Sequence, residues 1–288
     1  MLIIKVIKKV ILSLLRFIYK YIRYHITTAI FFTKKITLNT NGGLFCFLFN
    51  LNALIRKKNI KFYYDVRNKI YFAKSDKYKK YFYSKYQNYN SYINGIEERG
   101  TSIGKEYFLD KIKFNDKDIV IDVGANVGDL KIYFDKNNLN VQYIGIEPSP
   151  KEYYCLEKNV APSKTFNVGL WNKDGELNFY ISSDNADSSF IMPPKYCDEI
   201  KIQSKRLDSF FDQNIKLLKV EAEGAETEVI LGCEKLLSRI DYISADLGFE
   251  RGMSKKSTLA DVTNLLLKNN FKMIDFNSRI VVLYKRNI

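Results

Sequence analysis

The sequence predicts an α/β fold built on a doubly wound, mostly parallel sheet. From residue 118 onward, short apolar segments typical of buried strands alternate with segments of helical periodicity. Such alternation indicates parallel strands joined by crossover helices. A glycine turn, D-V-G-A-N-V-G, follows the first strand, and several strands end in an acidic residue. Because ligands of such sheets bind beyond the carboxyl ends of the strands, we expect a binding site at that edge.

The glycine turn belongs to a predicted strand–helix–strand unit that suits a nucleoside. The first strand, 119–121, ends at Asp122, and a helix begins near Asp129. We expect the backbone N–H groups of the turn to face a polar ligand. The second strand, 141–146, ends at Glu147, whose carboxylate can accept hydrogen bonds from both hydroxyls of a ribose.

The charge beside the turn indicates which nucleoside binds. A dinucleotide site needs G-x-G-x-x-G, whereas Asn126 stands near the place of the middle glycine. Asp122 would repel a pyrophosphate but suits a cation, and S-adenosylmethionine carries an ammonium, a sulfonium and a ribose. Two alternatives stay open: a Rossmann oxidoreductase or epimerase acting on nucleotide sugars, and a membrane-associated scaffold that has the fold without the chemistry.

Two further segments complete the expected cofactor site. The second helix begins at Pro150, with Ser149 as its N-cap and Glu152 completing a capping box. The third strand ends at Asn167 and Val168, where an amide side chain and a backbone amide would face an adenine edge. The polar loop 182–190 is of the kind that caps a site.

The rest of the C-terminal half continues the alternation. The expected elements are strands at 177–181, 200–206, 217–220 and 242–245, helices at 226–237 and 258–269, and a strand pair at 271–275 and 280–284. The short turn inside the last pair makes its two strands antiparallel.

Basic charge is concentrated in the N-terminal third. Residues 1–100 contain 20 Lys and Arg against 4 Asp and Glu, whereas residues 101–288 contain 26 against 28. The near-neutral second part disfavours a nucleic-acid groove there. The cysteines Cys46, Cys155, Cys197 and Cys233 are far apart, which disfavours a zinc site or a disulfide framework.

The N-terminal segment 1–24 predicts a helix with one basic and one broad apolar face. A charge at every turn excludes a membrane-spanning helix, and the segment lacks the features of a signal peptide. It either lies on an anionic membrane surface or packs on its own domain. After a turn at 38–43, we expect a helix at 44–55 and a hairpin at 60–73. The tyrosine-rich run 77–99 either stacks on sugars or bases or, as we favour, forms a helix that buries its rings on the core.

These motifs resemble the FkbM family of S-adenosylmethionine-dependent methyltransferases. The residues that carry the resemblance are D-V-G-A-N-V-G at 122–128, I-G-I-E-P-S-P at 144–150, R-L-D-S-F at 206–210 and L-K-V-E-A-E-G-A-E at 218–226. The resemblance implies a class I methyltransferase (Rossmann-like) fold with a seven-stranded mixed sheet whose last strand is antiparallel. It also implies O-methylation, with many members acting on sugars of surface glycans or on polyketides.

By motif match, the resemblance implies that the cofactor is bound by Asp122, Gly124, Asn126, Gly128 and Glu147. With their neighbours and the end of strand three, the candidate cofactor-binding residues are Asp122, Gly124, Ala125, Asn126, Gly128, Glu147, Pro148, Asn167 and Val168. The family commonly has Asp where this chain has Glu221, which places the role of that side chain in question.

A sugar hydroxyl needs a proton acceptor before it attacks the methyl group. The single histidine, His25, lies in the N-terminal segment, so the candidate bases are carboxylates. In order of preference they are Asp246, Glu221, Glu223 and Glu250. We expect no metal at the site, although three nearby carboxylates could hold Mg²⁺ or Ca²⁺.

The expected organisation is a basic arm at 1–40, a helix and hairpin extension at 41–100 that could cap the substrate, and a methyltransferase domain at 101–288. We expect a cytoplasmic enzyme, peripheral to the inner face of the membrane if the arm binds lipid. Its expected partner is a glycan, a glycolipid or another small hydroxyl acceptor, without nucleic acid.

Overall fold

The computed structural model describes residues 13, 16, 20, 40–182 and 188–287. The predicted arm 1–24 and the centre of the predicted capping loop 182–190 therefore lie largely outside the described residues. Every helix among the described residues is too short or too polar to cross a lipid bilayer.

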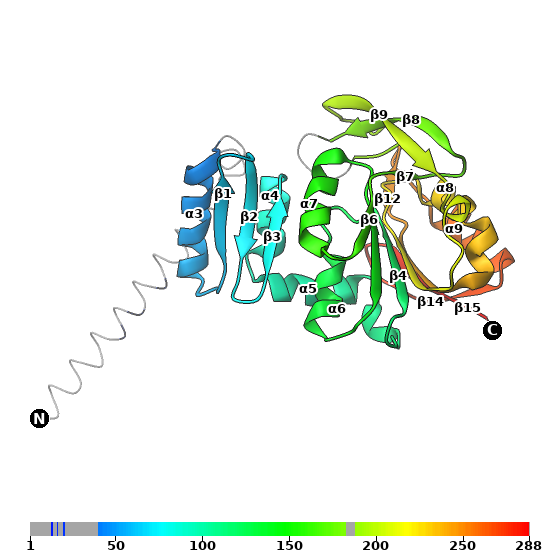
Figure 1. Ribbon diagram of the computed structural model, residues 1–288, viewed down its shortest axis with the longest axis horizontal. Helices are drawn as coiled ribbons and strands as arrows, with labels where there is room; N and C mark the ends of the chain where they lie inside the picture. Colours follow the sequence, from blue (N-terminus) through cyan, green and yellow to red (C-terminus); the bar gives the residue numbers. More distant parts are fainter. Residues whose placement is uncertain (1–12, 14–15, 17–19, 21–39, 183–187, 288) are drawn as a thin grey trace, which may run out of the picture.

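A seven-stranded sheet of order β14-β15-β11-β10-β4-β5-β6 forms the centre of the C-terminal part, as predicted (Figure 1). Its strands are β4 (Ile119–Val123), β5 (Gln142–Ile146), β6 (Lys164–Phe166), β10 (Ile215–Val220), β11 (Ile240–Asp246), β14 (Phe271–Phe276) and β15 (Val281–Arg286). The strands from β11 to β6 are parallel to one another, and β15 runs antiparallel to both of its neighbours.

Both faces of the sheet are buried because alternate side chains enter two different cores. Ile119 and Ile121 of β4 pack in one core, whereas Val120 between them packs in the other. The first core lies under α8 (Glu226–Leu231) and α9 (Leu259–Lys268). The second lies under α5 (Ile96–Glu106), α6 (Leu130–Lys136) and α7 (Pro150–Val160) (Figure 1). This arrangement confirms the doubly wound, class I methyltransferase architecture.

The extension forms a small layer of its own. It contains α3 (Gly42–Ile55), an antiparallel sheet of β1 (Lys61–Asp65), β2 (Ile70–Lys74) and β3 (Lys79–Phe82), and α4 (Lys85–Tyr92). The predicted helix and hairpin are thus confirmed. Tyr89 and Tyr92 of the tyrosine-rich run are buried in an aromatic core. That core also contains Val127 and Ile132 of the following domain, so the extension shares its interior with the domain.

A second small sheet, β7-β9-β8, supplies part of the site. Its strands are β7 (Gly169–Leu170), β8 (Gly175–Ile181) and β9 (Asp198–Lys205), and a hairpin of β12 (Phe249–Arg251) and β13 (Lys256–Ser257) follows β11. The strands expected at 177–181 and 200–206 are therefore confirmed as β8 and β9, which pair antiparallel.

Two local predictions were wrong. The helix expected over 226–237 ends at Leu231, and a 3-10 helix, Glu234–Arg239, follows. Between them, Gly232 lies so close to the carbonyl of Trp171 that a Cβ would meet it at 2.1 Å. The capping box is also absent from α7. The backbone N–H of Ser149 donates to Glu147 at 2.9 Å, and its hydroxyl donates to Glu152.

Candidate active site

The glycine turn joins β4 to α6 in a conformation that L-residues other than Asn rarely adopt. Gly124 has φ +67°, and a Cβ there would lie 1.8 Å from the carbonyl oxygen of Glu221. Asn126 has φ +49°, a region that Asn tolerates. The N–H groups of Gly124 and Ala125 both donate to the carbonyl of Ile146 at 3.0 Å. The expectation that these N–H groups face a ligand is therefore wrong, because the end of β5 uses them.

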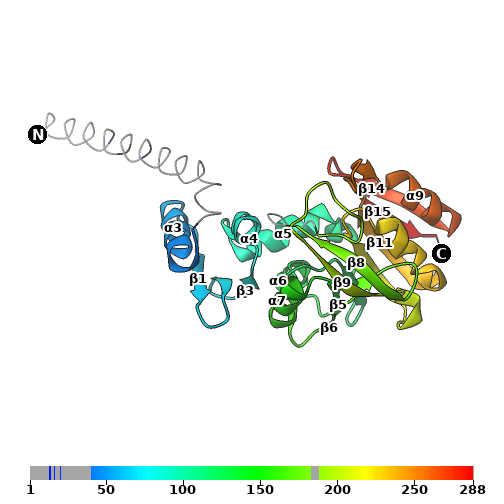
Figure 2. The same ribbon diagram turned by 90° about the horizontal axis from the view of Figure 1, so that it is seen from above.

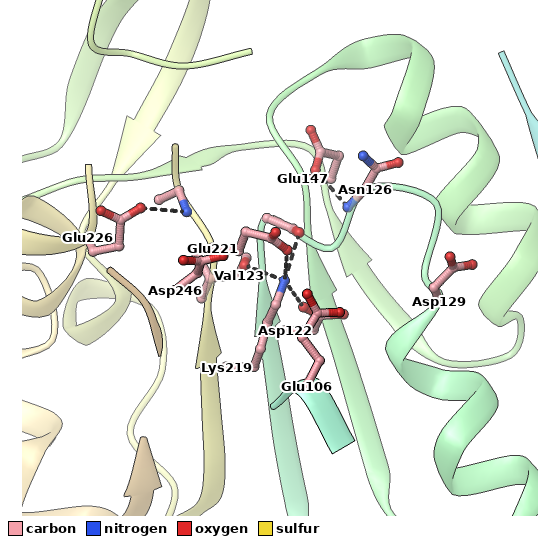
Figure 3. Close-up of polar contacts among 12 residues, drawn as sticks. Glu106, Asp122, Val123, Asn126, Asp129, Glu147, Lys219, Glu221, Glu226 and Asp246 are labelled. Atoms are coloured by element: carbon pink, nitrogen blue, oxygen red, sulfur yellow. Dashed lines mark hydrogen bonds and ion pairs between the residues drawn. The ribbon is translucent and has the colours of Figure 1, made fainter. Parts of the chain in front are cut away.

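A buried ion pair lies beneath the turn. The carboxylate of Asp122 is 3.0 Å from Nζ of Lys219 on β10 and accepts a 2.7 Å hydrogen bond from Tyr143. Lys219 also contacts Glu221 at 3.1 Å (Figure 3). It donates to the carbonyl of Gly124 at 3.0 Å. Burial alone would lower the pKa of Lys219, but the two carboxylates outweigh it and raise the pKa. This lysine thus ties the ends of β4 and β10 together, a contact that the sequence analysis missed.

Glu147 follows β5 and faces the glycine turn. Its carboxylate accepts the backbone N–H group of Asn126 at 2.8 Å (Figure 3). It also accepts the backbone N–H group of Ser149 at 2.9 Å. Burial, with a smaller effect from the charge of Glu152, raises the pKa of Glu147 to about 8. The same carboxylate lines a cavity, where it could accept hydrogen bonds from ribose hydroxyls.

Asn167 has a supporting position. Its side-chain amide donates to the carbonyls of Glu147 at 2.8 Å and Pro148 at 3.0 Å, and the residue lies outside the cavity lining. Pro148 and Val168 do line the cavity. Asn167 therefore fixes the segment after β5, and the neighbouring Val168 presents an apolar surface to the ligand.

Arg279, in the turn between β14 and β15, forms ion pairs with three carboxylates. Its guanidinium lies 2.8 Å from Glu221 and 2.7 Å from Asp246, and it also pairs with Glu106. Asp246 is fully buried behind it, whereas the Arg279 side chain keeps 47% of its surface exposed and lines the cavity. The sequence analysis missed this residue, because a single arginine in a turn carries little signal.

The four candidate bases differ in their surroundings. Asp246 is outside the cavity lining and paired with Arg279. Burial acts to raise the pKa of Glu221, but Lys219 and Arg279 outweigh it and lower the pKa to about 2. Glu223 lines the cavity, and its carbonyl accepts from Ser189 at 2.8 Å. Glu250 also lines the cavity, and burial, reinforced by the charge of Asp246, raises its pKa to about 8. Glu250 thus combines a place on the cavity wall with a pKa near neutral, which are the properties that a general base requires.

Two residues near the E-G-A-E motif are structural. Glu226 is buried and accepts the N–H groups of Ala222 and Gly224, each at 3.0 Å, so it shapes the loop after β10. Arg251 pairs with Glu228 at 2.7 Å. Arg251 therefore ties the hairpin of β12 and β13 to α8.

One cavity of about 530 Å³ joins these groups, within the usual range for small-molecule sites. The predicted site residues that line it are Asp122, Gly124, Ala125, Asn126, Glu147, Pro148, Val168, Glu221, Glu223 and Glu250. Gly128 and Asn167 lie behind this wall, as does Asp246. Gly128 packs so closely on α7 that a Cβ would lie 2.4 Å from Val160.

The charge of the cavity fits a cationic cofactor. Its wall contains the acids Asp122, Asp129, Glu147, Glu152, Asp198, Glu221, Glu223 and Glu250 and the bases Arg99, Lys151, Lys219 and Arg279. Arg99, Lys219 and Arg279 are already paired with carboxylates. The acids outnumber the bases even when Glu147 and Glu250, whose pKa values are about 8, are protonated. An excess of carboxylates favours a sulfonium and an ammonium and opposes a diphosphate. Glu147 supplies the acceptor that a ribose diol requires.

Comparisons with known proteins agree with this fit. The family profile described as "Methyltransferase FkbM domain" matches residues 122–273. The chain is 20% identical over 203 residues to the 2-O-methyltransferase NoeI of Sinorhizobium fredii, covering 62% of this chain and 84% of that protein. It is 24% identical over 165 residues to Methyltransferase 1 of Beauveria bassiana, covering 46% of this chain and 66% of that protein.

A solved structure, methyltransferase FkbM from Methylobacillus flagellatus, matches 70% of this chain with a TM-score of 0.47 and 15% identity. The chain spans 53% of that structure's length. The profile match covers more than half of the sequence, and it replaces the oxidoreductase alternative. The chain thus belongs to the FkbM family of methyltransferases, and its cofactor is S-adenosylmethionine.

Proposed function

We propose that this methyltransferase methylates a sugar hydroxyl of a surface glycan or glycolipid precursor. The observation that carries the proposal is Glu250, a partly buried carboxylate on the cavity wall with a pKa raised to about 8. An acceptor hydroxyl must lose a proton as it attacks, and a base with a pKa near the working pH accepts that proton most effectively. The distant relative named as a 2-O-methyltransferase also supports an oxygen acceptor.

S-adenosylmethionine supplies an activated methyl group on a sulfonium. The chain supplies orientation, exclusion of water and proton transfer. Glu147 holds the nucleoside end of the cavity, and Glu250 receives the proton of the acceptor hydroxyl at a carboxylate oxygen. Alignment of donor and acceptor alone can lower such a barrier by about 7–11 kcal/mol.

Glu221 has a different role in this proposal. With its pKa lowered to about 2, the carboxylate stays ionised and is a weak base at neutral pH. It is already paired with Lys219 at 3.1 Å and Arg279 at 2.8 Å. It is therefore an electrostatic anchor that offsets the positive charge of the methyl donor.

We also propose that the protein acts at the cytoplasmic face of a membrane, held there by the basic arm 1–24. Support comes from α3, whose outer side chains Leu44, Phe47 and Leu54 are 56%, 63% and 73% exposed. In both views α3 lies at the end of the molecule farthest from α9 (Figures 1 and 2).

The methylation proposal is tested with methyl-labelled S-adenosylmethionine and a carbohydrate and glycolipid extract from cells that lack the gene. The expected product is a labelled sugar that keeps its label through alkaline hydrolysis, because a methyl ether survives conditions that cleave a methyl ester. Label that is lost in alkali, or that is found only in protein or nucleic acid, would overturn the proposal.

A further inference from the structure

Three side chains of the N-terminal extension reach the end of the cofactor-binding turn. Lys80 on β3 donates from Nζ to the carbonyl of Gly128 at 3.0 Å. Tyr92, the last residue of α4, donates its hydroxyl to Asp129 at 2.5 Å, and Nε of Arg99 on α5 lies 2.9 Å from the other oxygen of that carboxylate. Two consecutive residues of the turn are therefore held from outside the domain that contains it.

These contacts are buried. Lys80 is 3% exposed, Tyr92 is fully buried and Asp129 is 7% exposed. Burial lowers the pKa of Lys80 to about 8, although the charge of Asp129 opposes that change. A lysine and an aspartate removed from water in this way are costly unless each is paired. The surrounding core of aromatic residues gives them little freedom to take other positions.

The side chain of Asp129 does not cap its own helix. It is the N-cap of α6, where an aspartate commonly accepts an N–H of its own helix. It makes no such capping bond here. Both of its oxygens are instead bound by Tyr92 and Arg99, so the start of α6 is tied to α4 of the extension and to α5.

A second tie runs through Asn159 of α7. Its side chain accepts the N–H of Tyr81 at 2.7 Å and donates to the carbonyl of the same residue at 2.9 Å. The same amide donates to the carbonyl of Val127 at 2.8 Å. Strand β3, α7 and the glycine turn are thus connected by one side chain.

We propose that Lys80 and Tyr92 are positioning residues for S-adenosylmethionine, and that the extension is an integral part of the cofactor site. The turn is short, so a shift at Gly128 or Asp129 moves its neighbours. The N–H of Gly128 donates to Ala125 at 2.8 Å, and Asn126 in turn holds the carboxylate of Glu147. Release of the outer contacts would therefore move the residues that face the ribose. The proposal rests on the cofactor assignment and is independent of the acceptor.

The test compares two tyrosines in which only a buried hydroxyl is removed. Tyr92→Phe removes the hydroxyl that binds Asp129. The control, Tyr284→Phe on β15, removes a hydroxyl that is hydrogen-bonded to Thr263 at 2.6 Å. Both rings are fully buried, so both variants should lose some thermal stability. Isothermal titration with S-adenosylmethionine, without acceptor, should show affinity weakened about tenfold in Tyr92→Phe and affinity changed less than about twofold in Tyr284→Phe.

A second pair of variants tests the same proposal if Tyr92→Phe folds poorly. Lys80→Met should weaken cofactor binding, while Lys79→Met, which changes the exposed neighbour, should not. Amide hydrogen exchange of residues 124–130 in the cofactor-free protein should speed up in Tyr92→Phe and Lys80→Met alone. Unchanged cofactor affinity in both of these variants, or equal losses in Tyr92→Phe and Tyr284→Phe, would show that the contacts are only structural. These affinity measurements use no acceptor, so they test the proposal even if the protein methylates no sugar.

Discussion

Nε of Arg279 lies 2.7 Å from the buried carboxylate of Asp246, which joins the turn after β14 to the end of β11. The same guanidinium holds Glu221 at 2.8 Å. The antiparallel terminal hairpin of the sheet thus supplies a cation that pairs with two carboxylates at the ends of neighbouring strands. Loss of this cation has consequences for stability that can be measured.

Arg279→Met should destabilise the protein by about 2–3 kcal/mol, because it leaves Asp246 buried without its cation. Urea unfolding measures this change. Lys111→Met is the matched control, since it breaks the partly exposed pair with Asp275 on the same hairpin and should cost about 0.5 kcal/mol. Adding Asp246→Asn to Arg279→Met should recover part of the loss. Equal unfolding midpoints for Arg279→Met and the wild type would contradict the assigned pairing.

Glu250→Gln should reduce methyl transfer about 100-fold, because the amide cannot accept the acceptor proton. The affinity for S-adenosylmethionine should change little. In the wild type, kcat should rise with pH and level off above about pH 8, following ionisation of Glu250. Glu199→Gln, which changes an exposed acid of β9, serves as the control. A pH profile of the same shape in Glu250→Gln and the wild type would remove Glu250 from the reaction.

Much of the sheet could be predicted, because strand and helix patterns are local. The acids at the ends of β4, β5, β10 and β11 were predicted in this way. The basic side chains that pair with those acids were not predicted. Lys219 sits in an apolar strand and Arg279 in a turn, and their roles depend on packing between segments far apart in the sequence.

The extension shows the same limit of local patterns. Lys80 stands in the run of lysines and tyrosines for which the sequence favours a helix, yet it lies on strand β3 and is buried against Gly128. The boundary expected at residue 100 also separates residues that share one core in the structure. Alternation predicts which residues form a strand, whereas the docking of one layer on another decides which face of that strand is covered.

Glu147 makes stability depend on pH. Its pKa is raised by burial from about 4.5 to about 8, so the folded protein retains a proton that the unfolded chain releases. This contribution to the free energy of unfolding is complete below about pH 4.5 and is lost as the pH rises through about 8. Glu147→Gln cannot ionise, so its stability relative to the wild type should increase across that window. Urea unfolding at pH 5 and pH 8.5 checks the sign.

Cofactor binding should release a proton through the same carboxylate. Hydrogen bonds from the ribose hydroxyls favour the ionised form and lower the pKa of Glu147. At pH 7, titration with S-adenosylmethionine in buffers of different ionisation enthalpy should show proton release in the wild type. Glu147→Gln should bind more weakly and release less. Equal release by the two proteins would place the proton on another group.

The membrane proposal predicts a role for the apolar side chains of α3. Phe47→Ser combined with Leu54→Ser should weaken binding of the full chain to vesicles containing phosphatidylglycerol by about tenfold, because both side chains are largely exposed in the free protein. Thermal stability should hardly change, for the same reason. Phe276→Ser with Met253→Ser removes exposed apolar surface at β14 and the β12–β13 turn, and should leave vesicle binding intact.

Deletion of residues 1–24 should lower binding to the same vesicles, and added salt should weaken what the wild type retains, because the arm attracts anionic lipid by charge. Cosedimentation measures both effects. If the α3 double variant binds as tightly as the wild type, the stripe does not touch lipid. If the stripe instead joins two copies of the chain, sedimentation velocity would show a dimer that the double variant loses, and the lipid role of α3 would be excluded.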